Sequence, residues 1–389
     1  MILKNRNIIV FADDWGRHPS TMQHLGKVLS SNNRLMWVGS LALRKPTFNF
    51  QDFNRILEKL KKIFFPPPSV EENEITNNVL EVHPFILPFH DVRTVRLLNN
   101  IMLTRFLKKK IRLNHFHNPI VISSSPIVYN LLGKLGETSS HYICLDDYSL
   151  FSGAFKSLVE LERRVLEKVD SSFSVSKSLL GTRVPKSGVN NFLHQGVEVE
   201  HFSKVKVKKI DKFDAIKKPI IGFFGLISEW VDVEMINSLA RTFPNYSIVL
   251  IGDSAIDVSQ LHNCPNIYLL GKVEYAELPA YASNFDVGII PFKINELTDA
   301  VNPLKLIEYL ALGLPVVTTP MYEVEKFKEY IYIANDSIEF RKMVDEAIKT
   351  NTSVMAEKRK HIASNYSWEI IADGIEKVIL EVEKGKIFE

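Results

Sequence analysis

The second half of the chain alternates short apolar runs with helical patterns, and this alternation restricts the possible folds more than any other feature. The runs are apolar along most of their length rather than at every second residue, which is typical of strands buried on both faces of a parallel sheet. The predicted strands are Pro219–Phe224, Tyr246–Ile251, Asn266–Leu270, Phe285–Ile290, Pro315–Thr319 and Tyr330–Ile333. The predicted helices are Asp232–Thr242, Tyr275–Ser283, Pro303–Leu312 and Ile338–Thr350. Strands and helices at this spacing predict βαβ units in an α/β domain with a parallel sheet.

The first half of the chain repeats this plan less regularly. Its predicted strands are Asn7–Ala12, Leu35–Gly39, Val79–Val82, Pro119–Ser123, His141–Leu145 and Ser172–Val175, and its predicted helices are Thr21–Ser30, Val92–Lys110, Pro126–Leu135 and Phe155–Lys168. The lysine-rich segment Lys204–Lys218 has no sustained helical period and separates the two halves. A chain of 389 residues suits two domains of ordinary size. We therefore expect one domain at residues 1–203, a second at 204–366, and a closing helix within 367–389 that packs back on the first domain.

Bulk properties exclude several classes of protein. With 46% hydrophobic and 24% charged residues, the chain has the composition of a soluble globular protein. A net charge of +3 gives no reason to expect a nucleic-acid partner. The two cysteines, Cys144 and Cys264, lie far apart in the sequence, so we expect neither a disulfide framework nor a cysteine-based metal motif.

The sequence also predicts a cytoplasmic protein without a resident cofactor. No apolar run reaches the roughly 18 residues of a membrane-spanning helix, and the run near the N-terminus is too short for a signal peptide. The histidines, among them His83, His115 and His117, show no H-E-x-x-H or comparable spacing. We therefore expect no metal site.

The segment Thr298–Pro320, TDAVNPLKLIEYLALGLPVVTTP, predicts a helix followed directly by a buried strand. Asn302 is a suitable N-cap, and Pro303 suits the first helical position, where a missing N–H costs nothing. Gly313 suits the end of the helix because glycine readily adopts the backbone conformation of a C-terminal cap.

The start of this predicted helix has the chemistry of a phosphate site. A helix N-terminus presents unpaired N–H groups that attract phosphate, and Lys305 adds a full positive charge in the first turn. Asn302, Leu304 and Lys305 are thus candidates for binding a diphosphate, and Glu308, one turn further, is a candidate acceptor for ribose hydroxyls. A surface ion pair between Lys305 and Glu308 is the alternative interpretation.

Other candidate residues follow the predicted strands of the second half, at the sheet edge where open α/β sheets bind ligands. Gly225 would let a phosphate or sugar approach the backbone closely, and an ordinary turn is the alternative. Thr298 and Asp299 are candidates for contacts with the hydroxyls of a donor sugar. Val273 and Tyr275 are candidates for flanking a base.

Two acidic residues end a strand in the first half. Asp146 and Asp147 follow the apolar run of HYICLDDYS. Mutual repulsion of two carboxylates can raise the pKa of one of them, which suits a general base, so both are candidate catalytic residues. A turn that begins with an N-capping aspartate is the alternative.

Two further segments of the first half suggest partners. The loop ADDWGRHPSTMQH follows the first predicted strand, and its polar side chains are candidates for lining an acceptor pocket: Asp13, Asp14, Arg17, His18, Ser20 and His24. The segment Ile101–Leu113 combines apolar residues with five cations, which suits an anionic membrane surface. A solvated helix face is the alternative for this segment.

These segments resemble GT-B glycosyltransferases of the broad glycosyltransferase 4-like superfamily, in particular those of bacterial exopolysaccharide and cell-surface glycan synthesis. NPLKLIEYLALGLPVVTTP resembles their donor-site signature, and FADDWGRHPSTMQHLGKVLS resembles their acceptor-side loop. YICLDDYS, LVELERRVLEKVDSSFSVSKSLL, HQGVEVEHF, IIGFFGLISEWVDVEMI and SWEIIADGIEKVI follow in the family's order. The resemblance implies two Rossmann-like domains that face a cleft, with a C-terminal helix that crosses back to the first domain.

By position, the resemblance implies that Lys305 binds the donor diphosphate and Glu308 the ribose. Asp146 stands at the strand end where relatives have a catalytic or sugar-contacting His or Asp. Ala300 departs from the family pattern, which has a glutamate there, and Asp299 is a possible substitute.

A second departure concerns positive charge. Ser228 and Glu229 stand where the family pattern has a basic pair after the first strand of the donor domain. Lys305 would then carry the positive charge of the donor site nearly alone.

The sequence thus predicts a metal-independent, hexosyltransferase-type enzyme that moves a sugar from a nucleotide-sugar, with UDP-sugar as the expected donor, to a glycan or lipid-linked acceptor in bacterial surface polysaccharide synthesis. It would lie in the cytoplasm, in contact with the inner face of the membrane. Two alternatives stay open. One is a UDP-sugar epimerase of the same fold, and the other is a non-catalytic nucleotide-sugar-binding assembly subunit, which Ala300 would favour.

Overall fold

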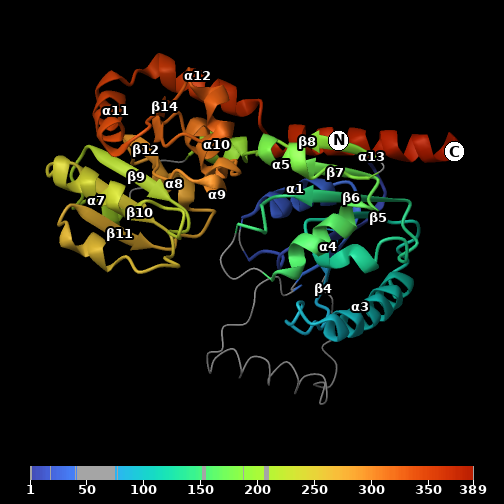
Figure 1. Ribbon diagram of the computed structural model, residues 1–389. Coiled ribbons are helices and arrows are strands. Elements are labelled where there is room, and N and C mark those ends of the chain that lie inside the picture. The colour runs from blue at the N-terminus through green and yellow to red at the C-terminus, as the bar shows by residue number, and fades with distance from the viewer. Residues whose placement is uncertain are drawn as a thin grey trace. The chain divides into compact units, whose positions relative to one another are not determined.

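The computed structural model describes residues 2–17, 19–39, 41, 75–76, 78–150, 155–186, 188–205 and 210–388 (Figure 1). The chain forms two compact units, each with its own sheet. The first unit comprises Met1–Val175, Leu179–Leu193 and Ala372–Glu389, and the second comprises Ser176–Ser178 and His194–Ile371. The domain boundaries predicted at residues 204 and 367 stay predictions.

The second unit is built on six parallel strands in the order β11-β10-β9-β12-β13-β14. All six predicted strands are present, with ends that shift by one or two residues: β9 (Ile220–Phe224), β10 (Ser247–Ile251), β11 (Ile267–Gly271), β12 (Val287–Ile290), β13 (Val316–Thr318) and β14 (Tyr332–Ile333). This is the strand order of a Rossmann sheet, in which the first three strands are added toward one edge and the next three, starting again beside the first strand, toward the other. The reversal lies between β9 and β12.

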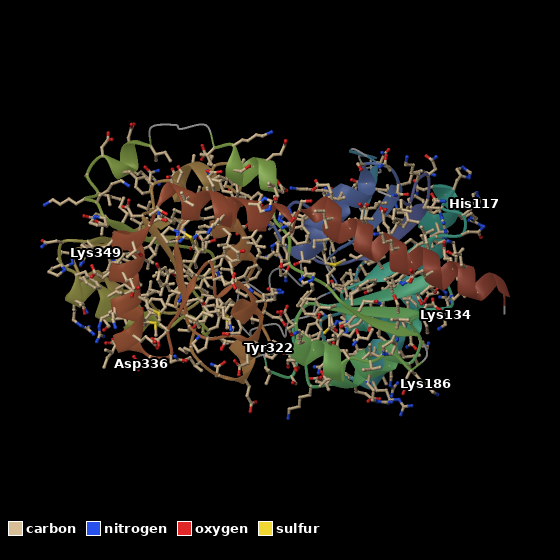
Figure 2. The ribbon with its side chains drawn as sticks, turned by 90° about the horizontal axis from the view of Figure 1, so that it is seen from above. His117, Lys134, Lys186, Tyr322, Asp336 and Lys349 are labelled. Carbon is tan, nitrogen blue, oxygen red and sulfur yellow. The ribbon has the colours of Figure 1, made fainter. Side chains whose placement is uncertain are left out.

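The four predicted helices are present, with ends that shift by up to three residues: α7 (Val233–Thr242), α8 (Leu278–Ala282), α10 (Leu304–Ala311) and α11 (Ser337–Thr350). The helices α6 (Val199–Ser203), α9 (Glu296–Asp299) and α12 (Ser353–Ser364) were not predicted, and 3-10 turns lie at Asp211–Phe213, Ser259–Asn263 and Tyr322–Phe327. Figure 2 labels Asp336, whose side chain caps the start of α11, and Lys349 in the last turn of that helix. Helix α12 was not predicted, because its stripe of buried residues is thin: only Arg359 and Ala363 are fully covered.

Helix α10 is fixed against the sheet through Tyr309. Its ring lies 4.5 Å from that of Phe224 at the end of β9, and its hydroxyl accepts from the Phe224 backbone N–H. Gly313 ends the helix as predicted, with φ of +78°. The N–H groups of Gly313 and Leu314 close the last turn on the carbonyls of Leu310 and Tyr309.

The described residues of the first unit form eight strands in the order β3-β4-β2-β1-β5-β6-β7-β8, all parallel except the two-residue β3. They are β1 (Asn7–Phe11), β2 (Arg34–Val38), β3 (Ile75–Thr76), β4 (Val79–Val82), β5 (Ile120–Ser123), β6 (Ser139–Cys144), β7 (Ser171–Ser174) and β8 (Val189–Phe192). The six predicted strands are present. Strand β8 was not predicted, because its sequence VNNF has little apolar character and none of its residues is fully buried.

Among the described residues of the first unit, the helices before the C-terminal one are α1 (Thr21–Ser30), α3 (Arg93–Leu113) and α4 (Ser157–Leu166), and α5 (Lys177–Thr182) begins in the second unit and continues in the first. The prediction of a helix at Pro126–Leu135 was wrong: a 3-10 turn covers Pro126–Asn130 only. Gly133 and Gly136 adopt positive φ values of +82° and +73°, which a helix does not accommodate.

The C-terminal helix α13 (Trp368–Phe388) belongs to the first unit from Ala372 onward, as the predicted closing helix requires. The buried carboxylate of Glu376 accepts hydrogen bonds from backbone N–H groups at the start of the chain. One turn before the end of the helix, Glu383 forms an ion pair with Arg6. These contacts anchor the helix on the first unit.

Candidate functional site

Lys305 lies at the reversal of strand order in the second unit. Its ammonium nitrogen is 5.0 Å from the ring centre of Phe223 on β9 and 4.7 Å from that of Phe292, which follows β12. A Cβ built on Gly225, the residue after β9, would lie 3.3 Å from the same nitrogen. The lysine therefore stands between the carboxyl ends of β9 and β12, where open α/β sheets bind their ligands.

Two glycines shape this edge of the sheet. Gly225 has φ of +124°, and Gly252, the residue after β10, has φ of +139°. A Cβ on Gly252 would lie 2.1 Å from the carbonyl oxygen of Gly225, so the two backbones are packed too closely for a side chain. The sequence singled out Gly225 only. Gly252, which the sequence analysis did not name, allows the backbone after β10 to approach the backbone at Gly225 closely.

Lys305 and Glu308 both have altered protonation behaviour. Burial lowers the pKa of Lys305 to about 8, and the Glu308 carboxylate acts in the opposite direction. Burial raises the pKa of Glu308 to about 7, while Lys305 and the Tyr275 hydroxyl lower it and Glu198 raises it. The altered pKa values are typical of groups in ligand sites rather than of an exposed ion pair.

The pair Val273 and Tyr275 follows β11. Tyr275 lies beside Glu308, and burial raises the pKa of its hydroxyl. Its ring centre is 5.0 Å from that of His201, whose Nε2 is 2.9 Å from the Tyr275 carbonyl oxygen. Val273 is half-buried two residues after the strand ends. Both residues thus follow the strand next to β10, and Tyr275 contributes to the surroundings of Glu308.

The start of α10 differs from the prediction. Pro303, not Asn302, is the N-cap, and no side chain caps the helix. The residue before a proline is disfavoured in helical conformation, and Pro303 itself is extended with ψ of 115°, so the helix begins at Leu304. Asn302 is buried just before it. In the first turn of α10 the Leu306 N–H donates to the Pro303 carbonyl, and no side chain caps the N–H groups before it.

The two predicted donor-sugar residues lie at the end of the short helix α9. Thr298 is completely buried and forms a capping box with Asn295, and its hydroxyl also donates to the Lys293 carbonyl. Its side chain thus has a structural role, because its hydroxyl is used within the protein. Asp299 is exposed, and the neighbouring Ala300 ends α9.

Asp146 and Asp147 have different surroundings in the structure. Arg183 pairs with the Asp147 carboxylate at 2.8 Å, and that carboxylate also accepts from the backbone N–H and hydroxyl of Ser149. Arg183 also pairs at 3.0 Å with Glu162, which is buried. The turn that the sequence offered as an alternative is therefore present at Asp147, whose carboxylate is held by Arg183 and Ser149, and a catalytic role for Asp147 stays a prediction. Asp146 is exposed at the end of β6.

The predicted acceptor loop follows β1, at the reversal of strand order in the first unit. Asp13 and Arg17 are exposed, and the Asp14 carboxylate lies 3.7 Å from the Arg17 guanidinium. Ser20 caps α1 and His24 is buried within that helix, so neither is an open pocket residue. His18 lies outside the described residues. Within the described part of the chain, no group of three or more His, Cys, Asp or Glu side chains is arranged to hold a metal ion.

Helix α3 exposes apolar and cationic side chains together. Leu97, Leu98 and Ile101 are 61%, 47% and 42% exposed, and the exposed cations follow one to three turns after Ile101: Arg105, Lys108, Lys109 and Arg112. The helix contains no acidic residue. Among the described helices, none is both long enough and apolar enough to cross a membrane.

The sequence analysis did not predict three residues that contact the charged groups of these sites. Phe223 and Phe292 looked like ordinary core residues, and Arg183 stands far from Asp147 in the sequence. Only the pairing of β9 with β12 and of β6 with β7 brings them to their partners. A residue of the core that also touches a charged group leaves no mark in the hydrophobic pattern.

Comparison with known proteins agrees with these features. Residues 218–349 match the family model described as glycosyl transferases group 1. The chain is 31% identical over 231 residues to TuaH of Bacillus subtilis (strain 168), whose name assigns it to teichuronic acid biosynthesis as a glycosyltransferase. It is 26% identical over 210 residues to a processive diacylglycerol alpha-glucosyltransferase of Acholeplasma laidlawii. These alignments cover 55% and 50% of this chain, and they span only 57% and 61% of the two relatives.

Solved structures share the fold at low sequence identity. Sucrose-phosphate synthase from Thermosynechococcus elongatus aligns with a TM-score of 0.73 and 14% identity, over 98% of this chain and 100% of that one. Anabaena HepE, solved in complex with UDP and glucose, aligns with a TM-score of 0.67 and 13% identity, over 97% of this chain and 100% of that one. The chain thus has the GT-B fold, and its residues 218–349 are similar to the group 1 glycosyl transferases.

Proposed function

We propose that this protein is a glycosyltransferase that takes a sugar, of hexosyl type, from a UDP-sugar. The observation that carries the proposal is the position of Lys305, a cation beside Gly225 at the open edge of a Rossmann sheet. The match of residues 218–349 to group 1 glycosyl transferases supports it, and so does the shared fold with a protein solved with UDP and glucose.

The donor roles follow from this geometry. The Lys305 ammonium would stabilise the diphosphate as it departs, without need for a divalent cation. The backbone N–H groups of Leu304 and Lys305, in the first turn of α10 shortly after Asn302, would assist it. Glu308 would accept hydrogen bonds from the ribose. Asp299 would contact the donor sugar, and Val273 and Tyr275 would flank the base.

The acceptor would bind through the first unit. Asp146 is exposed at a strand end, so it would deprotonate the acceptor hydroxyl in an inverting reaction or contact the donor sugar in a retaining one. Asp13, Asp14 and Arg17 would contribute to the acceptor pocket. The similarity to TuaH supports a glycan of the bacterial cell surface as the acceptor class.

The acceptor is lipid-linked in this proposal, and α3 would hold the enzyme at the inner face of the membrane. Its exposed leucines and isoleucine can enter the interfacial region while the lysines and arginines meet anionic headgroups. Cosedimentation with vesicles of phosphatidylcholine, with and without phosphatidylglycerol, tests this. The variant Lys108→Glu/Lys109→Glu should lose binding to the anionic vesicles.

A matched control for the vesicle experiment is Lys342→Glu/Lys358→Glu. It changes the net charge equally through exposed lysines of α11 and α12. Equal loss in both variants would mean that only net charge matters, and would remove α3 from the membrane surface.

The activity is tested in two steps. Thermal stabilisation by UDP-, GDP- and dTDP-sugars identifies the donor, because a ligand that binds only the folded state raises the melting temperature. The stabilising donor, carrying a radiolabelled sugar, is then incubated with a lipid extract, with EDTA as the test for metal independence. Labelled lipid product supports the transferase. Conversion of the donor without any acceptor would identify an epimerase, and stabilisation without turnover would identify a binding subunit.

A further inference from the structure

Lys305 is enclosed by aromatic rings from both sides of the strand reversal. We propose that Phe223 and Phe292 form an aromatic clamp that keeps the Lys305 ammonium charged and in place beside Gly225, so that both phenylalanines are positioning residues for a diphosphate. The inference rests on the proposed function, in which Lys305 binds the diphosphate of the donor.

The geometry of the clamp is that of a cation–π pair on each side. The ammonium nitrogen lies 5.0 Å and 4.7 Å from the two ring centres, within the roughly 6 Å over which a ring face attracts a cation. The backbone at both rings is held by hydrogen bonds: Phe223 is a residue of β9, and the backbone of Phe292 forms an isolated antiparallel bridge with Val231. The two phenylalanines are 0% and 3% exposed. The rings therefore form a rigid seat for a flexible lysine side chain.

The charges around Lys305 explain why aromatic rings suit this position better than a second carboxylate. Burial disfavours the charged form of Lys305, and Glu308, one turn along the same helix, is the charged group that favours it. The loop from Leu226 to Asp232 contains no lysine or arginine that could share the task of binding a diphosphate. A second carboxylate beside the lysine would hold the ammonium but repel the ligand. A ring face attracts the ammonium and carries no net charge, so it leaves the diphosphate attraction intact.

Ordinary core packing is the competing explanation for the two rings, and fluorination separates the two. Phenylalanine with one, two or three ring fluorines at position 292 keeps nearly the same shape and loses its negative face stepwise. The same series at Phe340, a fully buried residue of the same unit, is the matched control. Phe292→Leu serves as a second variant, and thermal unfolding checks that each protein is folded.

Two readouts are needed. The first is the NMR titration of the Lys305 side chain in the free protein, labelled with ¹³C at Cε and assigned through the missing signal of Lys305→Arg. The second is the affinity for UDP at pH 7.5. We expect each fluorine at position 292 to lower the titration midpoint of Lys305, by about 0.3–1.5 pH units for the full series, and to weaken UDP binding at pH 7.5 by up to about 8-fold. The series at position 340 should change neither.

A titration midpoint that does not respond to fluorine at position 292, or that shifts equally for position 340, would overturn the clamp. This outcome is distinct from failure of the proposed function. If the unmodified protein does not bind UDP, the donor assignment fails, while the lysine titration still decides whether the rings stabilise the ammonium.

Discussion

Donor binding should have a bell-shaped dependence on pH, because it requires a charged Lys305 and an ionised Glu308. The pKa of the lysine is lowered to about 8 and that of the glutamate is raised to about 7. Below pH 7 the glutamate gains a proton and loses its capacity to accept two ribose hydroxyls. Above pH 8 the lysine loses the proton that gives it its charge. The binding-competent form therefore dominates only in a narrow range around pH 7.5.

The size of the effect follows from the two titrations. Treated as independent, both groups are correctly charged in about 0.6 of the molecules at pH 7.5 and in about 0.1 at pH 6 or pH 9. The affinity for a UDP-sugar should thus fall about sixfold in each direction. Isothermal titration calorimetry with UDP-glucose between pH 5.5 and 9.5 measures it, at constant ionic strength.

Two variants assign the two arms of the curve. Lys305→Arg keeps its charge throughout this range, so the alkaline loss of affinity should disappear, and any part that belongs to the nucleotide base should persist. Glu308→Gln should flatten the acidic arm at a reduced overall affinity. A flat curve for the unmodified protein, or an alkaline loss unchanged in Lys305→Arg, would refute the roles given to the two residues.

Further predictions concern the strand ends. Gly225→Ala should weaken UDP binding and lower stability by about 1–3 kcal/mol, because its φ of +124° disfavours a side chain and the new Cβ would lie 3.3 Å from the Lys305 nitrogen; calorimetry and thermal unfolding measure both, and an unchanged affinity would contradict it. Asp147→Asn should lower the melting temperature, since it leaves the Arg183 charge with Glu162 alone. Asp146→Asn should lower it less but reduce sugar transfer about 100-fold or more. Transfer that survives in Asp146→Asn would exclude this residue as the base.

The fold was largely predictable because burial on both faces leaves a plain signal. Continuous apolar runs such as Ile220–Phe224 and Ser247–Ile251 have few alternatives to a parallel strand. The pattern was insufficient where burial is partial or the backbone is special. Strand β8 is only partly covered, and the turn after Pro126 is decided by two glycines with positive φ.

The candidate site was predictable only where chemistry and local pattern coincide. Lys305 and Glu308 carry charges inside an otherwise apolar helix, so they were visible in the sequence. The cap at Asn302 was misplaced because proline offered two positions for the helix start, and only the extended backbone of Pro303 decides between them. The role of Phe292 depends on a contact between elements, which no local pattern encodes.

The central claim is that the charge of Lys305 binds the diphosphate of the donor. The affinity for UDP of the unmodified protein, Lys305→Ala and Lys305→Arg can be compared by calorimetry at pH 7.5. Loss of a charged contact to the diphosphate should weaken binding by about 10- to 100-fold in the alanine variant, with much of it restored by arginine. Equal affinity in all three proteins, with unchanged transfer rates, would contradict the assignment of Lys305 to the donor diphosphate.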